Sequence, residues 1–242
     1  MPRRSTQPGR QLALPLRLDP QANFETLVDG ANSAAFTHVR QLASTARGDV
    51  LWLWGGPGRG KSHALQAACR EADEAGKRAM YVPLDAAAEA GPELLADLDT
   101  LDFLALDALD PLAGSAEWET RLFAVLNGFQ SRERTLLIAA RQAPSAIAFA
   151  LPDLASRAAG AIVYRIRALD DEEQALALIR HARHRGLTLD AAAARFLQAR
   201  VARDMPALCA WLGRLDAASL QAQRRITIPF IREALQGGQA AP

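Results

Sequence analysis

The segment Gly55–Ser62 limits the folds open to this chain more than any other feature, and its sequence is GGPGRGKS. It matches the pattern G-x-x-x-x-G-K-[ST] of a phosphate-binding loop. Glycines let such a loop turn its backbone N–H groups toward phosphate oxygens, and a helix beginning at Lys61 adds the positive end of its dipole. A glycine-rich turn without function is the alternative. The loop follows an apolar run, Val50–Trp54, and opens a helical pattern, which favours a purine nucleotide site.

The loop assigns a role to each polar group near the phosphates. Lys61 would lie between the β- and γ-phosphates, and Ser62 would ligate Mg²⁺. Asp107 ends the apolar run FLALD and is the candidate for the second Mg²⁺ ligand, although a simple strand-end aspartate is the alternative. ADP or ATP with Mg²⁺ is therefore expected, and the residues do not decide between the two nucleotides. The nucleotide-binding residues predicted from the sequence are Gly55, Gly56, Pro57, Gly58, Arg59, Gly60, Lys61, Ser62 and His63.

The groups that would activate water are missing. A hydrolysing protein of this kind usually carries an acid directly after the magnesium-binding aspartate, and Ala108 stands there. Asp110 follows nearby but can instead cap the next turn. Ala139 and Ala140 occupy the end of the fourth apolar run, where a polar group is often found. We expect a chain that is not an efficient ATPase by itself.

Apolar runs alternate with helical patterns over the first two thirds of the chain, which predicts an α/β fold with a five-stranded parallel sheet. Asn32 or Ser33 can cap a helix that runs to about residue 47. Beyond Asp170, which forms a capping box with Glu173, we find only helical patterns. The expected strands are 50–54, 80–82, 101–107, 135–139 and 161–166, and the expected helices include 61–75, 117–132, 170–186, 190–202, 204–223 and one from 227. The predicted units are a tail (1–20), an α/β nucleotide-binding domain (21–168) and a small all-helical domain (169–242).

Composition excludes several classes of protein. The 28 basic and 27 acidic residues leave a net charge of +1, which is not the basic excess of a protein that grips bare DNA. No apolar run reaches the roughly 18 residues of a membrane span, and no apolar leader follows Met1. The two cysteines belong to no metal or redox motif, which suits a reducing compartment. We therefore expect a cytoplasmic protein without a membrane partner.

Four segments together resemble the DnaA/Hda branch of the AAA+ superfamily. They are GGPGRGKSH (55–63), FETLVDGANSAA (24–35), LPDLASRAAG (151–160) and RLDAASLQAQRRITIPFIREAL (214–235). The resemblance runs from about residue 11 to residue 235 and implies an AAA+ core followed by a helical lid. It also implies that the chain has no dedicated DNA-reading domain, because DnaA continues into a helix-turn-helix domain and this chain stops at Pro242.

The resemblance implies two sites of contact with other proteins. Arg157 aligns with the family's arginine finger, which would act in trans on ATP held by DnaA; a solvated or dipole-paired arginine is the alternative. The peptide QLALPL resembles a motif that binds the sliding clamp, the β subunit of DNA polymerase III. An apolar stretch folded back on the domain is the alternative. The clamp-binding residues would be Gln11, Leu12, Leu14, Pro15 and Leu16.

The implied function is regulatory inactivation of DnaA: a nucleotide-bound regulator docks on the clamp and stimulates hydrolysis of DnaA-bound ATP, which inhibits replication initiation. One alternative is a self-sufficient ATPase that loads a helicase, as DnaC does, and another is an adaptor that uses nucleotide only for folding. A homodimer is compatible with the family. The chain departs from the family at Pro206, where an arginine usually touches the nucleotide, and Arg203 is the nearest substitute. We expect weakened turnover and γ-phosphate sensing.

Overall fold

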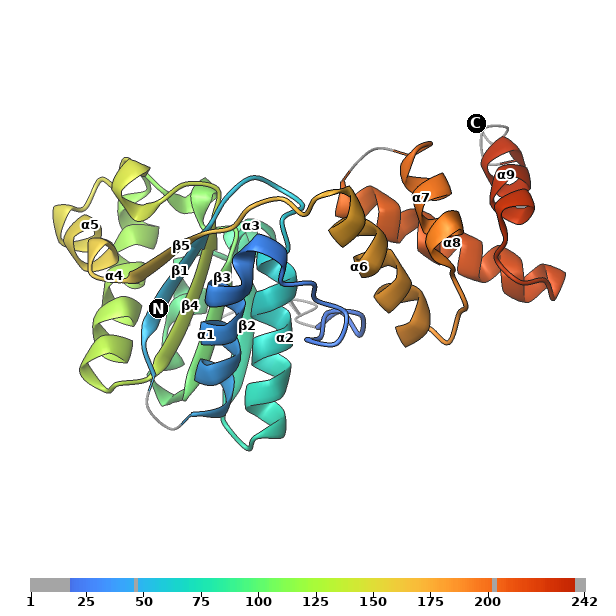
Figure 1. Ribbon diagram of the computed structural model, residues 1–242. Helices are drawn as coiled ribbons and strands as arrows, with labels where there is room; N and C mark the ends of the chain where they lie inside the picture. Colours follow the sequence, from blue (N-terminus) through green and yellow to red (C-terminus); the bar gives the residue numbers. More distant parts are fainter. Residues whose placement is uncertain (1–17, 46–47, 202–203, 238–242) are drawn as a thin grey trace, which may run out of the picture.

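The computed structural model describes residues 18–45, 48–201 and 204–237. It contains an α/β part followed by a helical part, which are joined by one extended segment (Figure 1). The predicted clamp-binding peptide, residues 11–16, lies outside the described residues, as does Arg203. No helix of the described ranges is long and apolar enough to cross a membrane.

The predicted five-stranded parallel sheet is confirmed. Its strand order is β2-β3-β4-β1-β5, and every neighbouring pair is parallel. The strands are β1 (Val50–Trp54), β2 (Ala79–Pro83), β3 (Phe103–Asp107), β4 (Thr135–Ala140) and β5 (Ile162–Arg165). This order brings the carboxyl ends of β1, β3 and β4 together, so the phosphate loop after β1 lies beside the residues that end its neighbours.

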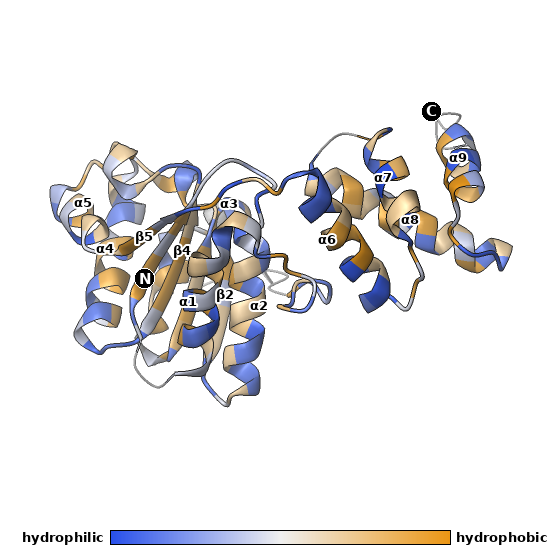
Figure 2. Cartoon of the chain, viewed as in Figure 1, coloured by the Kyte–Doolittle hydropathy of each residue, from blue (hydrophilic) through white to orange (hydrophobic). Residues whose placement is uncertain are grey.

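Helices cover both faces of the sheet (Figure 1). Side chains alternate along each strand. In β1, Leu51 and Leu53 therefore pack with α1 and α2, whereas Val50 and Trp52 pack with α4 and α5. Figure 2 shows the resulting hydrophobic strands between helices whose outer surfaces are largely hydrophilic. The helices are α1 (Ser33–Ser44), α2 (Lys61–Glu74), α3 (Leu84–Ala87), α4 (Ala116–Ser131) and α5 (Pro152–Ala159).

The helical part has a hydrophobic core of its own, to which Leu178, Leu197, Leu212 and Ile231 contribute. The predicted capping box is present: Asp170 Oδ1 accepts the N–H of Glu173, and Glu173 Oε2 accepts the N–H of Asp170. The helices are α6 (Asp171–His184), α7 (Ala191–Gln198), α8 (Met205–Ala222) and α9 (Ile228–Gly237). The predicted helix 190–202 is therefore too long, because Ala199 already serves as the C-cap of α7.

The interpretation of Asn32 as a helix cap is wrong. Asn32 stands at the N-cap position of α1 but makes no capping hydrogen bond. Its amide instead pairs with the backbone of Arg167, accepting the N–H at 2.8 Å and donating to the carbonyl at 3.1 Å. Helix α1 also ends at Ser44, earlier than expected. The buried Asn32 thus fastens the segment between β5 and α6 to the start of α1.

Candidate nucleotide site

The loop between β1 and α2 requires its glycines. Gly58 and Gly60 have φ values of +69° and +86°, which L side chains rarely adopt. Gly55 has a φ of +151°, and a Cβ there would lie 2.5 Å from the carbonyl oxygen of Ile166. The close turn therefore needs glycine at all three positions, of which the motif itself fixes Gly55 and Gly60.

The Lys61 ammonium is held at the loop. Its Nζ donates to the carbonyl oxygens of Gly55 at 2.7 Å and Gly56 at 2.8 Å. Burial lowers the pKa of Lys61, while the nearby carboxylates of Asp107 and Asp110 oppose that shift. This arrangement keeps a cation beside the N-terminus of α2, where a phosphate would bind.

A cavity of about 500 Å³ adjoins the loop. Its lining combines the loop, the N-terminal segment (residues 18–29), the ends of β3 and β4, and helices α6 and α8. A space of this size suits a mononucleotide. The predicted loop residues that line it are Pro57, Gly58, Arg59, Gly60, Lys61, Ser62 and His63, whereas Gly55 and Gly56 are not part of the lining.

Asp107 lies in the same cavity and is 6% exposed. Tyr81 Oη donates to its Oδ2 at 2.7 Å, and the N–H of Ala108 donates to its Oδ1 at 2.9 Å. A carboxylate offers about four lone-pair positions, so Asp107 keeps capacity for a metal or a metal-bound water. Ser62 and Asp107 both offer oxygen atoms, the ligands that Mg²⁺ prefers, and both line the cavity.

Asp110 also lines the cavity, but the residue directly after Asp107 offers no acid for water activation. Ala108 follows it with a φ of +54°. The prediction that Asp110 can cap the next turn is wrong, because both of its carboxylate oxygens accept the N–H of Arg141 at 2.9 Å. Ala140 lies in the cavity lining at the end of β4 and brings no polar side chain to it.

The helical part closes the cavity opposite the loop. Pro206, in the first turn of α8, lies so near the loop that a Cβ on Gly58 would be 3.2 Å from Pro206 Cδ. Helix α8 tolerates this proline, and Asp204 caps it by accepting the N–H of Ala207 at 2.8 Å. The position expected to carry an arginine therefore presents an apolar ring to the loop.

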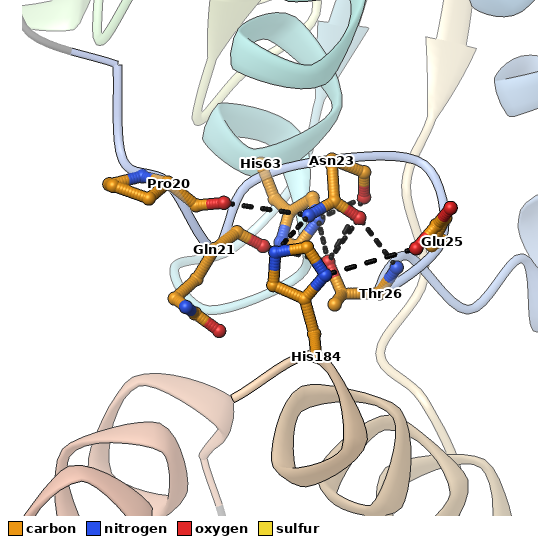
Figure 3. A network of polar contacts seen from close by, with 7 residues as sticks. All are labelled: Pro20, Gln21, Asn23, Glu25, Thr26, His63 and His184. Atoms are coloured by element: carbon orange, nitrogen blue, oxygen red, sulfur yellow. Dashed lines mark hydrogen bonds and ion pairs between the residues drawn. The ribbon is translucent and has the colours of Figure 1, made fainter. Parts of the chain in front are cut away.

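The N-terminal segment connects the loop helix to α6 (Figure 3). His63 Nε2 contacts the carbonyl oxygen of Asn23 at 2.8 Å, and Asn23 Nδ2 contacts His184 Nε2 at 3.1 Å. Because a carbonyl can only accept, His63 Nε2 carries the proton. Arg180 Nη1 also donates to the carbonyl oxygen of Leu27 at 2.7 Å. Residues of α2 and α6 thus hold the same short segment.

Arg157 lies elsewhere. It is exposed in the last turn of α5 and is not part of the cavity lining. Within the described residues, its guanidinium makes no hydrogen bond or ion pair. Figure 1 shows α5 at the side of the α/β part that faces away from α6–α9. The structure therefore does not bring Arg157 to the chain's own phosphate loop.

Sequence reasoning missed several residues that shape the site. Tyr81 is a strand residue whose hydroxyl happens to reach Asp107, and a single tyrosine in an apolar strand gives no signal of this. Glu119 is not part of the cavity lining, but it is fully buried, and its position among the apolar residues of α4 could have revealed that. His181 is buried in α6 and lines the cavity.

The fold and the loop define an AAA+ protein: a parallel sheet in the order found here, a phosphate loop after β1 and a helical lid over the cavity. The family model for the bacterial DnaA ATPase domain matches residues 18–164, and the model for the lid domain of Hda matches residues 171–235. The chain therefore belongs to the family of bacterial DnaA ATPase domains and carries a lid of the Hda type. It is a DnaA-related AAA+ regulator, and we call α6–α9 the lid.

Solved structures agree in fold. Domain III of the replication initiation protein DnaA from Thermotoga maritima superimposes with a TM-score of 0.75 at 21% identity, covering 91% of this chain and 98% of that one. AMPPCP-bound DnaA from Aquifex aeolicus gives 0.60 at 25% identity over 74% of this chain, which spans 60% of that chain's length. The Thermotoga maritima RuvB branch migration motor gives 0.57 at 17% identity, covering 84% of this chain and 67% of that one.

Proposed function

We propose that this regulator binds ADP or ATP with Mg²⁺, docks on the DNA sliding clamp through residues 11–16, and stimulates hydrolysis of the ATP held by DnaA. The result is inactivation of the initiator. One observation carries the proposal: Arg157 is exposed, without a partner among the described residues, and outside the cavity of its own chain. An arginine so placed is available to a nucleotide on another protein.

The cavity supports the nucleotide part of the proposal. Lys61 and the N-terminus of α2 offer positive charge to phosphates, while Ser62 and Asp107 would hold Mg²⁺. When bound, the metal neutralises phosphate charge. The DnaA of Aquifex aeolicus was solved with AMPPCP, an analogue of ATP, which supports an adenine nucleotide here.

Hydrolysis of the ATP bound to DnaA would need only one group from this chain, the guanidinium of Arg157. An arginine finger offered across an interface stabilises the charge of the transition state and is worth about 10³–10⁵ in rate. The finger acts whether or not its own chain hydrolyses nucleotide. Ala108 and Pro206 are therefore no obstacle to the proposed role, and both are consistent with a nucleotide that orders the domain instead of being turned over.

Clamp docking is argued from Gln11, Leu14 and Leu16 of the QLALPL peptide, whose apolar side chains would fill a pocket while the glutamine binds at its edge. Clamp binding would bring the regulator to replicated DNA, where a partner DnaA could meet Arg157.

The test is an ATPase assay with DnaA, DNA-loaded clamp and this protein. We expect the wild-type chain to accelerate hydrolysis and Arg157→Ala to abolish the acceleration while leaving clamp and ADP binding intact. Arg183→Ala, which changes an exposed arginine of α6, is the matched control and keeps full stimulation. Stimulation that survives Arg157→Ala rejects the mechanism. DNA-stimulated turnover by the isolated chain would instead support the DnaC-like alternative.

A further inference from the structure

The charge of the chain is distributed unevenly. Residues 191–242 carry seven arginines and three acidic residues, an excess of +4, whereas the whole chain has a net charge of +1. The arginines are Arg195, Arg200, Arg203, Arg214, Arg224, Arg225 and Arg232. Helices α7, α8 and α9 belong to this segment, so positive charge is concentrated in the part of the lid that follows α6. A local basic excess can attract an anionic partner even when the protein as a whole is nearly neutral.

Two of these arginines contact one aromatic ring. The guanidinium carbon of Arg200, just after α7, lies 3.5 Å from the centroid of the Phe196 ring, and its Nη1 donates to the Phe196 carbonyl oxygen at 3.3 Å. The guanidinium carbon of Arg232, in α9, lies 5.7 Å from the same centroid. The attraction between a cation and an aromatic ring helps to orient both groups. Two positive charges from different elements are thus held at one place on the lid.

Neither charge is compensated. Arg200 and Arg232 are both exposed, and within the described residues neither guanidinium forms an ion pair. Arg195 and Arg224, by contrast, are each paired with a glutamate. Like charges held close together repel each other, and an anion placed between them would relieve that repulsion. The arrangement therefore favours a negatively charged partner.

The pair of arginines lies away from the nucleotide site. Figure 1 shows α9 at the end of the lid that is farthest from the α/β part. Neither Arg200 nor Arg232 is part of the cavity lining. A partner at this end of the lid can therefore be bound while a nucleotide occupies the cavity.

The chemistry of the pair suits phosphate groups. A guanidinium offers several donors in one plane, which matches the oxygens of a phosphate. Proteins that hold single strands stack bases on free aromatic rings. Phe196 is half-buried and already has Arg200 over its ring, so it is not free for a base. Arginine contacts without a stacking ring are typical of binding to the phosphate backbone, which positions a protein without reading sequence.

We propose that Arg200 and Arg232 form a patch on the lid that binds the phosphate backbone of duplex DNA. The proposal deepens the proposed function and rests on it in one respect, because docking on the clamp would bring the lid to the DNA that the clamp encircles. The patch itself depends on neither the nucleotide nor Arg157. Two phosphate contacts give weak binding alone, and clamp docking raises the effective concentration of DNA at the patch.

The experiment measures binding of the full chain to a fluorescently labelled duplex by anisotropy, at several salt concentrations and with several sequences. Binding should weaken as salt rises. We expect Arg200→Gln and Arg232→Gln each to reduce the slope of log affinity against log salt by about 1, equally for every sequence. Arg200→Lys keeps the charge and should keep the slope. Arg183→Gln is the matched control, because it removes the same charge from an exposed arginine of α6 and should also keep the slope.

Wild-type slopes in both glutamine variants overturn the inference, and so does an equal loss in Arg183→Gln, which would mean that overall charge decides. No binding of the wild type to duplex, either free or loaded with clamp, overturns it as well. Lost stimulation of DnaA hydrolysis with normal duplex binding would assign the pair to an acidic protein surface instead. A wild-type chain that binds duplex with the expected slopes but neither binds the clamp nor stimulates DnaA rejects the proposed function and leaves the patch in place.

Discussion

Tyr81 Oη donates a 2.7 Å hydrogen bond to Asp107 Oδ2, so a residue of β2 holds the carboxylate that ends β3. Register places Tyr81 beside Ala105, two residues before Asp107 along the neighbouring strand. The bond is largely buried, and its acceptor is the only carboxylate of β3. The edge strand therefore orients the candidate magnesium ligand from the side away from the phosphate loop.

We expect Tyr81→Phe to lower the free energy of unfolding by about 2 kcal/mol, the usual worth of a hydrogen bond to a charged group. It should also reduce the gain in ADP affinity that Mg²⁺ gives, because Asp107 loses its orienting partner. Urea unfolding and calorimetry with and without Mg²⁺ measure the two effects. Tyr164→Phe is the control, because among the described residues the Tyr164 hydroxyl has one hydrogen-bond partner, His38 Nδ1 at 3.3 Å. A Tyr81→Phe protein with wild-type Mg²⁺ dependence contradicts this prediction.

The contact between Gly58 and Pro206 predicts that the loop cannot accept a side chain. Gly58→Ala should cost about 1 kcal/mol in stability for its left-handed backbone and should also push on the proline of the lid. Gly114 has a similar φ of +87° but nothing within 4 Å of an added Cβ. Gly114→Ala should therefore lose stability alone, whereas Gly58→Ala also loses ADP affinity. Equal ADP affinities in the two variants would show that crowding between residue 58 and Pro206 does not affect nucleotide binding.

The fold could be predicted from the sequence because its signals are local. Apolar runs, the glycine loop and the Asp170 capping box each depend on residues close in sequence, and the structure confirms the sheet and the box. Asn32 shows the limit. Its residue type and position suggest a cap, yet its amide pairs with Arg167, 135 residues away. No local pattern distinguishes these two uses of an asparagine.

The sequence predicts the part of the candidate site that would bind phosphates, but not the part lined by the N-terminal segment and the lid. The loop motif names the residues near the phosphates. Gln21, His181 and Arg185 come from two distant segments, and only the packing of the lid on the α/β part places them around one cavity. Tyr81 and Asp107 likewise meet through strand pairing. Sequence spacing cannot predict such contacts, because the residues that form them are far apart along the chain.

Glu119 of α4 is hydrogen-bonded to the start of α5, the helix that carries the proposed arginine finger Arg157. Its fully buried carboxylate accepts three backbone N–H groups, from Gly114 at 2.6 Å, Ala150 at 3.1 Å and Leu151 at 2.7 Å. Leu151 is the N-cap of α5. We expect Glu119→Gln to destabilise the protein by about 2 kcal/mol, because one amide nitrogen would then face backbone donors.

The same variant should weaken stimulation of DnaA hydrolysis without changing ADP affinity, since α5 is held away from the cavity. Glu117→Gln changes an exposed carboxylate of the same helix and should leave both properties intact. Unfolding in urea and the initiator ATPase assay give the two readings. Full stimulation by a destabilised Glu119→Gln protein would mean that this carboxylate supports the fold without positioning the finger.

His181 predicts how stability depends on pH. Burial, with help from His63, Arg185 and His184, lowers its pKa from 6.5 to about 4, and Asp19 opposes the shift. Between these two pKa values His181 is protonated in the unfolded chain and neutral in the folded chain, so stability is lost as pH falls from 6.5 toward 4. Linkage gives a loss of about 2 kcal/mol between pH 7 and pH 5 from this group. His63, whose pKa burial also lowers, adds in the same direction. Urea unfolding across this range should show a shallower slope for His181→Phe than for the wild type. Identical slopes in the two proteins would mean that His181 is already protonated in the folded state at pH 5.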